Sequence, residues 1–365
     1  MNNSLKLFVV LCCLVFATAC DKPNSQAPLP GGQEEVTPDP QQPDEETDQP
    51  QKPDEPVKPD PAVYPEGLTV QELSYTHSDG RKTRYFLASI DFKKNPQLQF
   101  TVTLNQPKAT PSQVYKNFDS DYGIPYVVTN AGYFAGATSV SPVFVNSFCS
   151  VIAPLSITWP NYEHPEADVY VTRAAIGQMK DGSMDIAWVY CCDPDSRTHY
   201  SFPCPWNNNE KTKTFMPDPP TTEVPGAQVW KPVWGIGGGP MLVMDGKDVA
   251  MDSYWKECLN SGGTAGSSHV PRTGAGLDKD GNLLLIVADG RGMKGSPGLT
   301  LPELAEVFIS HGAIKAMNLD GGGSSAMIGK EGELLNWPSD TGSGSTAVQR
   351  KVTTCIAVSL LPSKK

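Results

Sequence analysis

The chain has 365 residues, of which 19% are charged, and its formal net charge at pH 7 is −11. This length suits one large domain or two small ones. Residues 21–63 hold 11 acidic side chains against 3 lysines, so most of the acidity is concentrated there. The rest of the chain shows no basic excess, which excludes the usual electrostatic basis for binding nucleic acid.

The N-terminus reads MNNSLKLFVVLCCLVFATAC, with Lys6 ahead of an apolar stretch, residues 7–19. This stretch is too short to span a bilayer comfortably, and the pattern is typical of a secretory signal peptide. Its end resembles a bacterial lipoprotein cleavage box, so we predict a lipid on Cys20, with ordinary cleavage near Ala19 as the alternative. The sequence therefore predicts an exported protein, lipid-anchored in the bacterial cell envelope and either periplasmic or surface-exposed.

After this predicted signal peptide (1–20), residues 21–63 form a segment rich in Pro, Asp, Glu and Gln. A segment with so little to bury cannot offset the entropy cost of ordering its backbone. We therefore expect a disordered, partly extended linker, followed by one folded domain over residues 64–365.

Short strand patterns dominate the predicted domain. Residues 81–92 and 98–105 alternate like strands, 126–129 is an apolar run, and the turn signal at 180–182 predicts a hairpin. The stretch 191–228 is rich in Pro, Asn and Thr, which predicts a long irregular insertion. Six cysteines fall in the domain, and in an exported protein we expect one or two structural disulfides.

One helix signal stands near the C-terminal end of the chain. Thr300 and Glu303 have the spacing of a capping box, and Gly312 is a natural stop. The expected order is a strand (283–288), this helix, and a second strand (316–319), and such a crossover favours a parallel pair. We therefore predict an α+β fold with a strand-rich mixed-sheet core, few helices, and one strand–helix–strand crossover that carries the site.

An acidic residue follows each strand of this crossover, Asp289 the first and Asp320 the second. Ligands of parallel sheets bind at the C-terminal ends of strands, so two neighbouring strands would turn both carboxylates into one crevice. Asp320 opens the segment LDGGGSS, whose Gly amides could face the oxygens of an anion. The segment has no lysine, which excludes a nucleotide P-loop, and a tight turn between strands is the plainer alternative.

Arginines and polar residues accompany these acids in the sequence. Arg272 and Thr273 precede a strand, and Arg291 follows the first acid closely. Guanidinium groups match phosphate oxygens, although exposed ion pairs are the commoner use of such arginines. Asn130 and Tyr133 are a polar pair at a strand end, where turn chemistry and packing are the alternative roles.

The sequence predicts no metal site. The five histidines show no spacing typical of metal ligands, although His269 stands close to Arg272 and stays open as a site residue. Residues 278–282, DKDGN, lack the distal Glu of a calcium loop, so we expect a hairpin turn there.

Five segments carry a family resemblance: VTNAGYF, GIGGGPMLV, VPRTGAGLDKDGNLLLIVADGR, GLTLPELAEVFISHGAIKAMNLDGGGSSAMI and LNWPSD. From Tyr126 to Val358 the chain resembles the phosphodiester glycosidases, a family that removes N-acetylglucosamine linked through its anomeric carbon to a phosphate. The chain departs from the family pattern at Ala131, where many members have Gly. It also lacks the usual Arg-Pro-Val in the segment GSGSTAVQRKVTTCIAVS.

The resemblance implies hydrolysis of a sugar-1-phosphodiester in an exported glycan or glycopolymer. The implied site gathers Asn130, Tyr133, Arg272, Thr273, Asp289, Arg291, Asn318, Asp320, Gly321, Gly322, Gly323, Ser324 and Ser325. One carboxylate, Asp320 or Asp289, would act as base or nucleophile while the other orients it. The arginines and the amides of the three glycines would hold the phosphate.

Two other functions stay open at this point. A non-catalytic cell-surface lipoprotein that binds glycans would suit the linker and the predicted lipid equally well. A metal-dependent phosphodiesterase would cut the P–O bond; no His-rich ligand set supports it, but a carboxylate-bound Ca²⁺ or Mg²⁺ stays open. The expected glycosidase uses no cofactor. Its expected partners are a phosphorylated glycan or glycopolymer and the membrane, through the lipid on Cys20, with no nucleic acid.

Overall fold

The computed structural model describes residues 60, 62–158, 168–260, 264–341 and 346–361. The predicted signal peptide with Cys20, and the predicted linker up to residue 59, lie outside the described residues. All described residues belong to one unit, Asp54–Lys365. Among them, no helix combines the length and the apolar character that crossing a membrane requires.

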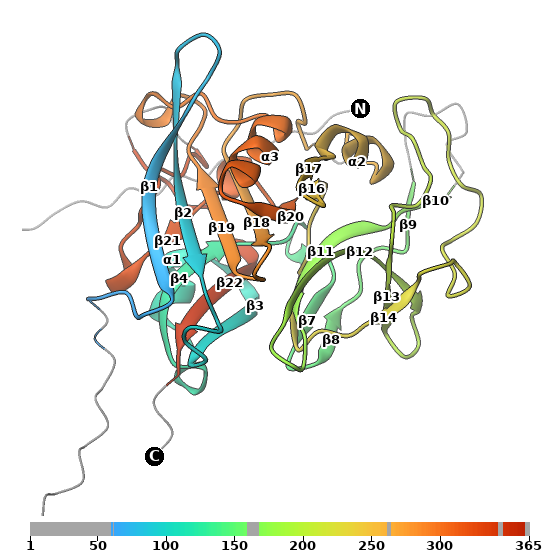
Figure 1. The fold of residues 1–365 in the computed structure, drawn as a ribbon, viewed down its shortest axis with the longest axis horizontal. Helices are drawn as coiled ribbons and strands as arrows, with labels where there is room; N and C mark the ends of the chain where they lie inside the picture. Colours follow the sequence, from blue (N-terminus) through green and yellow to red (C-terminus); the bar gives the residue numbers. More distant parts are fainter. Residues whose placement is uncertain (1–59, 61, 159–167, 261–263, 342–345, 362–365) are drawn as a thin grey trace, which may run out of the picture. The chain divides into compact units, whose positions relative to one another are not determined.

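Two seven-stranded sheets and one four-stranded sheet make up most of the described fold (Figure 1). In spatial order, the first sheet contains β1 (Leu68–Thr76), β2 (Lys82–Ile90), β19 (Leu283–Ala288), β18 (Arg272–Asp278), β20 (Ala313–Asn318), β16 (Met241–Met244) and β17 (Lys247–Asp248). The four-stranded second sheet contains β21 (Met327–Ile328), β4 (Ile124–Asn130), β22 (Val352–Leu360) and β3 (Leu98–Ala109).

The third sheet contains, in spatial order, β14 (Gln228–Trp230), β13 (Thr198–Phe202), β12 (Met184–Asp193), β11 (Arg173–Gln178), β15 (Trp234–Gly237), β7 (Val143–Val145) and β8 (Phe148–Val151). Two small ribbons pair β9 (Ser156–Thr158) with β10 (Asp168–Tyr170) and β5 (Phe134–Ala135) with β6 (Thr138–Ser139). The α-helices of the described residues are α1 (Pro111–Lys116), α2 (Ala250–Lys256) and α3 (Leu301–Ser310). The predicted strand-rich domain with few helices is confirmed.

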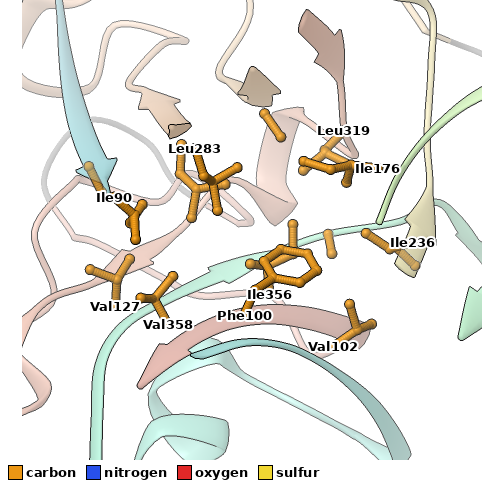
Figure 2. Packing of buried hydrophobic residues seen from close by; sticks show 14 of the residues in the cluster. Ile90, Phe100, Val102, Val127, Ile176, Ile236, Leu283, Leu319, Ile356 and Val358 are labelled. Carbon is orange, nitrogen blue, oxygen red and sulfur yellow. The ribbon is translucent and has the colours of Figure 1, made fainter. Parts of the chain in front are cut away.

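The main core joins all three sheets, as Figure 2 shows for part of it. Ile90 and Leu283 come from the first sheet, Val127 and Val358 from the second, and Ile176 from the third, and all are fully buried. Burying a side chain of this size stabilises the folded state by about 1.5 to 3 kcal/mol. The four-stranded sheet carrying β4 is therefore held against the sheet carrying β20, and the candidate site lies where these two strands end.

Helices α2 and α3 cover the other face of the first sheet. α3 begins as predicted, because the Thr300 hydroxyl accepts from the Glu303 amide and the Glu303 carboxylate accepts from the Thr300 amide. Its Phe308 ring packs directly on β18, where a Cβ at Gly274 or Gly276 would come within 2.7 Å of the ring. These two glycines let α3 approach the sheet closely, which positions the crossover that leads to β20.

The crossover from β19 through α3 to β20 is present, but its strands are not neighbours. β18 lies between them and is antiparallel to both, because the predicted hairpin turn at residues 278–282 folds β18 back along β19. All pairings between the named strands are antiparallel. The predicted mixed sheet is therefore wrong for the described residues, and one full strand separates the two crossover strands.

Residues 191–228, predicted as an irregular insertion, contain more strand than expected. The end of β12 and all of β13 fall inside this stretch, and from 203 to 227 the chain has one isolated bridge, between Asn209 and Thr214. Trp206, in the irregular part, donates its ring N–H to the Asp218 carbonyl over 3.0 Å. The six described cysteines are free thiols, so the one or two expected disulfides are not formed in the described residues.

Candidate active site

A cavity of about 540 Å³ opens at the end of β20. Asp320 and the glycine turn (Gly321–Gly323) form part of its wall, and the loop before β18 forms another part. Four arginines also line it: Arg173, Arg272, Arg291 and Arg350. Of the described residues in its lining, Asp320 is the one carboxylic acid. The wall therefore has an excess of positive charge, which suits an anionic ligand.

The backbone of Asp320 is fixed by the end of β4. Its N–H donates to the Ala131 carbonyl over 2.8 Å, and its carbonyl accepts from Asn130 Nδ2 over 2.5 Å. The Asn130 side-chain oxygen accepts in turn from the Thr273 hydroxyl and the Ala326 amide. Asn130 and Thr273, both predicted site residues, are thus fully buried groups that position the acid from behind.

The Asp320 side chain has the environment of a functional acid. Burial raises the pKa of its carboxyl to about 6, and this effect outweighs the Ser324 hydroxyl, the Arg350 guanidinium and the Gly321 amide, which all lower it. A carboxyl group with a pKa near neutrality can both gain and lose a proton at physiological pH. Asp320 and Ser324 are therefore brought together as predicted, and Arg350 joins them.

The glycine amides are less available than predicted. The Gly322 amide donates to the Pro271 carbonyl over 2.8 Å, and the Gly321 amide hydrogen-bonds the Asp320 carboxyl. A short 3₁₀ turn, Gly322–Ser324, explains this difference, because it curls the segment back on itself. The prediction that three free amides face a phosphate is therefore wrong for Gly321 and Gly322.

The need for glycine in this turn has another explanation: arginine side chains pack too close to its backbone to leave room for a Cβ. A Cβ at Gly323 would lie 2.6 Å from Arg350 Nη2 and 2.8 Å from Asp340 Oδ1. A Cβ at Gly322 would lie 3.0 Å from Arg291 Nη2, and Gly322 also has φ +61. The turn thus leaves room for two guanidinium groups close to its backbone.

Arg350 is a site residue that the sequence analysis missed. Its Nε donates to Asp340 Oδ1 over 2.6 Å and its Nη1 donates to Ser324 Oγ over 3.3 Å. Arg350 lies just before β22, in the segment that lacks the family's usual Arg-Pro-Val. The sequence signal that could have found it is the lone arginine of QRKV in that segment. A second hollow beside the cavity shares Asp320 and Arg350 and adds Lys108 and Lys351, which extends the cationic surface.

The two predicted arginines differ in role. Arg272 is 2% exposed, and its guanidinium donates to the carbonyls of Leu299, Ala265 and Ser268 over 2.6 to 3.1 Å. Burial lowers the pKa of Arg272 to about 10. Arg272 therefore connects two loops at the cavity wall through hydrogen bonds to their carbonyls. Arg291 is exposed at the rim, where its Nη1 donates to the Ser339 carbonyl over 3.3 Å.

Arg173, which the sequence analysis also missed, begins β11 and lines the cavity. Its Nε donates to the Glu257 carbonyl over 3.4 Å, and burial lowers its pKa. In the sequence it is one arginine at the start of an apolar strand, so only the packing of the third sheet against the first reveals its position.

Tyr133 and Asn318 form a polar pair in the cavity wall. Asn318 Nδ2 donates to the Tyr133 hydroxyl over 2.7 Å, and that hydroxyl donates to the Gly239 carbonyl over 2.6 Å. Burial raises the pKa of Tyr133 to about 12, so it stays a neutral hydroxyl. Asn318 Oδ1 and the hydroxyl oxygen of Ser325 are buried without a protein partner. A ligand hydroxyl or water could supply the missing donor to Asn318.

Asp289 lies outside the cavity lining and faces a different set of partners. Its Oδ2 accepts from Arg84 Nε over 2.8 Å, and its Oδ1 accepts from the Trp337 amide and from Asn336 Nδ2. Burial raises the pKa of Asp289, and this effect outweighs the three donors, which lower the pKa. Asn336 also donates to the Ser325 carbonyl, so Asp289 supports the glycine turn indirectly. The expectation that both carboxylates face one crevice is wrong, because β18 separates the two strands.

A solved structure shares this fold. The zebrafish N-acetylglucosamine-1-phosphodiester alpha-N-acetylglucosaminidase catalytic domain, solved in a form auto-inhibited by its pro-peptide, aligns with a TM-score of 0.55. The alignment covers 80% of this chain and 82% of that domain at 16% identity, which establishes a shared fold alone.

Sequence comparison shows similarity to one family over the C-terminal part of the chain. Residues 205–359 match the family model described as phosphodiester glycosidase. N-acetylglucosamine-1-phosphodiester alpha-N-acetylglucosaminidases are 34% identical to this chain in Mus musculus and 33% identical in Homo sapiens, each over 110 residues. The aligned stretch covers 30% and 29% of this chain but only 20% and 21% of those relatives. The resemblance found in the sequence is confirmed.

Proposed function

We propose that this protein is a hydrolase of glycosyl phosphodiester bonds that releases a sugar from a sugar-1-phosphodiester. One observation carries the proposal: Asp320, whose pKa burial raises to about 6, lies in a cavity that four arginines line. A phosphodiester has the negative charge that this wall attracts. The stretch that matches the family model includes both Asp320 and Arg350.

The chemistry requires one carboxylate near the anomeric carbon. The bond from that carbon to the phosphate oxygen breaks, the phosphate leaves as a monoester anion, and water supplies the new sugar hydroxyl. At pH 7 Asp320 is mostly ionised, so it can attack the anomeric carbon or take a proton from the incoming water. A phosphate leaves without strong protonation, so this scheme needs no second acid in the cavity, and Asp289 serves only to orient the turn.

The charged and apolar walls suit the two ends of such a substrate. Arg350 and Arg291 flank the glycine turn and would hold the phosphate. Leu155, Ile157 and Leu259 line another part of the cavity, where the apolar face of a sugar ring or an N-acetyl methyl group could pack. The proposed substrate class is therefore an N-acetylglucosamine-1-phosphate-type linkage in an exported glycan or glycopolymer, and the proposed chemistry uses no cofactor.

The same proposal includes the place where the enzyme acts. The signal pattern, the acidic linker and Cys20 support export and a lipid anchor in a bacterial cell envelope. A Cys20→Ser variant should shift the protein from the membrane fraction to the soluble fraction of the cell envelope. Unchanged membrane association would contradict the lipid anchor while leaving the catalytic proposal intact.

Product analysis in ¹⁸O-labelled water tests the reaction. The substrate is the methyl phosphodiester of N-acetylglucosamine-1-phosphate. A glycosidase releases N-acetylglucosamine that carries the label at its anomeric hydroxyl, together with unlabelled methyl phosphate. Label in the phosphate product would identify a phosphodiesterase instead. Saturable binding of the diester without any product would identify a glycan-binding protein, and either result would overturn the proposal.

A further inference from the structure

Two histidines and a glutamate from distant parts of the sequence meet beside the N-terminus of α3. His77 follows β1, His269 lies in the loop before β18, and Glu303 is in the first turn of α3. His77 Nδ1 lies 2.9 Å from Glu303 Oε1, and His269 Nε2 lies 3.2 Å from the same oxygen. One ligand atom from each residue lies within 4.8 Å of the other two.

The hydrogen bonds of Thr83 favour one tautomer of His77. The Thr83 hydroxyl donates its one proton to the Gly298 carbonyl over 2.9 Å. His77 Nε2 lies 2.8 Å from the same hydroxyl oxygen, and in the tautomer that matches this arrangement Nε2 is the donor. In neutral His77 the other nitrogen, Nδ1, therefore has a lone pair, and this lone pair faces the Glu303 carboxylate.

A lone pair and a carboxylate oxygen at 2.9 Å repel each other unless a cation lies between them. The second histidine faces the same oxygen, so two imidazoles and one carboxylate converge. The bonds of a tetrahedral zinc ion to nitrogen and oxygen are about 2.0 to 2.1 Å long, which separates adjacent ligand atoms by about 3.3 Å. The observed separations of 2.9 and 3.2 Å come within a few tenths of an ångström of that spacing.

We propose that His77 Nδ1, His269 Nε2 and a Glu303 oxygen bind one zinc-class divalent ion. Imidazole nitrogens favour such transition metals over Ca²⁺ and Mg²⁺, which prefer oxygen ligands. Outer partners are already in place, because His77 Nε2 donates to Thr83 and Glu303 Oε2 accepts from the Thr300 amide and hydroxyl. Water can complete the coordination, since 37% of the His269 side chain is exposed.

The ion would join the β1–β2 hairpin and the start of α3 to the loop before β18, and this loop forms part of the active-site wall. This loop supplies the Ser268 and Ala265 carbonyls that hold Arg272, and Ser268 directly precedes His269. Ala265 and Arg272 both line the cavity. The ion therefore has a structural role outside the cavity, and its binding does not depend on the reaction proposed above.

Zinc titration of chelator-treated, reduced protein tests the site, with a chromophoric chelator as the competitor. Three variants accompany the wild type: His269→Ala removes an exposed ligand, Glu303→Gln removes the charge while keeping an oxygen to cap α3, and His311→Ala is the control. We expect one zinc ion per wild-type protein. The first two variants should lower its affinity by about 100-fold or more, because outer partners alone are worth about 10- to 100-fold, and the control should not.

Cobalt(II) spectra separate this site from binding by the free cysteines. The proposed ligands predict visible d–d bands without the near-ultraviolet charge-transfer band of a cobalt–thiolate bond. A thiolate band in the wild type that persists in His269→Ala would overturn the proposal. So would a failure to saturate at one zinc ion, or equal affinity in the wild type and both ligand variants, which would mean that a proton fills the place of the metal between His77 and Glu303.

Discussion

Asn130 and Asp320 lie 190 residues apart in the chain, yet the side chain of the first donates to the backbone carbonyl of the second over 2.5 Å. Thr273, at the start of β18, donates its hydroxyl proton to the side-chain oxygen of Asn130. Three strands thus fix the position of one acid before any ligand binds. This pre-organisation is what a catalytic carboxylate requires, because a group that is already held in place needs no reorganisation in the transition state.

Replacing Asp320 with Asn should abolish turnover while the protein stays folded. The amide cannot act as a base or nucleophile, so we expect kcat to fall by about 10³-fold or more. The measurement is sugar release from the methyl phosphodiester substrate, with circular dichroism as the check on folding. Asp252→Asn, on the exposed surface of α2, is the matched control and should keep full activity. Activity in purified Asp320→Asn close to that of the wild type would remove Asp320 from the mechanism.

Replacing Asp289 with Asn should act mainly on stability. The change leaves the Arg84 guanidinium beside a neutral group in a buried place, and we expect the free energy of unfolding to fall by about 2 to 3 kcal/mol. Urea unfolding measures this loss, and Asp79→Asn, in an exposed pair with Arg81, should change nothing measurable. The folded fraction should keep far more activity than Asp320→Asn. Equal inactivation of the two variants at full stability would mean that Asp289 takes part in the chemistry.

The raised pKa of Asp320 predicts how stability depends on pH. The folded state holds the proton up to about pH 6, whereas a carboxyl in the unfolded chain releases it near pH 4, so the folded state binds more protons between these values. The free energy of unfolding contributed by Asp320 therefore falls as the pH rises from about 4 to 6. Asp320→Asn, which has no charge to bury, should be more stable than the wild type by about 2 kcal/mol at pH 7.5.

The difference between Asp320→Asn and the wild type should shrink toward zero near pH 4, where both side chains are neutral. Thermal or urea unfolding at a series of pH values measures it. A constant difference across this range, or a less stable variant at pH 7.5, would contradict the raised pKa.

Variants of Arg350 and Arg272 should have different effects: the first should weaken substrate binding, and the second should lower the stability of the fold. Arg350→Ala removes a charged donor from the cavity, and we expect KM for the diester to rise by about 10- to 100-fold with little change in stability. Arg272→Leu removes the three hydrogen bonds that its buried guanidinium donates to the Leu299, Ala265 and Ser268 carbonyls, so we expect it to lower the free energy of unfolding by about 3 kcal/mol. Substrate kinetics and urea unfolding of both variants check this. The reverse pattern would restore Arg272 as the main phosphate ligand.

Gly323→Ala should displace Arg350 from the turn. The added methyl group would lie 2.6 Å from Arg350 Nη2 and 2.9 Å from the Cα of Asp340, so the guanidinium must move away from Ser324 and the Asp340 backbone must shift as well. We expect KM to rise about as much as in Arg350→Ala, because both changes remove the same group from the phosphate. Gly182→Ala, in an exposed hairpin with φ +85 and open space, should cost stability without changing KM. An unchanged KM in Gly323→Ala would show that this contact does not matter for substrate binding.

Features set by neighbouring residues could be predicted from the sequence. The capping box of α3 depends on Thr300 and Glu303, three residues apart, and the turn at 278–282 depends on five consecutive residues. Asp320 and its glycine turn could also be found, because so much Gly directly behind an acid is unusual in a regular element. The partners of each charged group could not, since the order of strands in a sheet decides them.

What the sequence by itself determined is therefore local: where α3 begins, where chains turn, and which segment holds the acid, because hydrogen bonds and backbone preferences over a few residues set these features. Only the tertiary structure decided that β18 separates Asp289 from Asp320, that Arg350 rather than Arg272 offers donors at the glycine turn, and that His77 meets His269 and Glu303. These relationships depend on how sheets and loops pack and pair over sequence separations from 26 residues, for Arg350 and Ser324, to 226 residues, for His77 and Glu303, and local sequence patterns contain no record of that pairing.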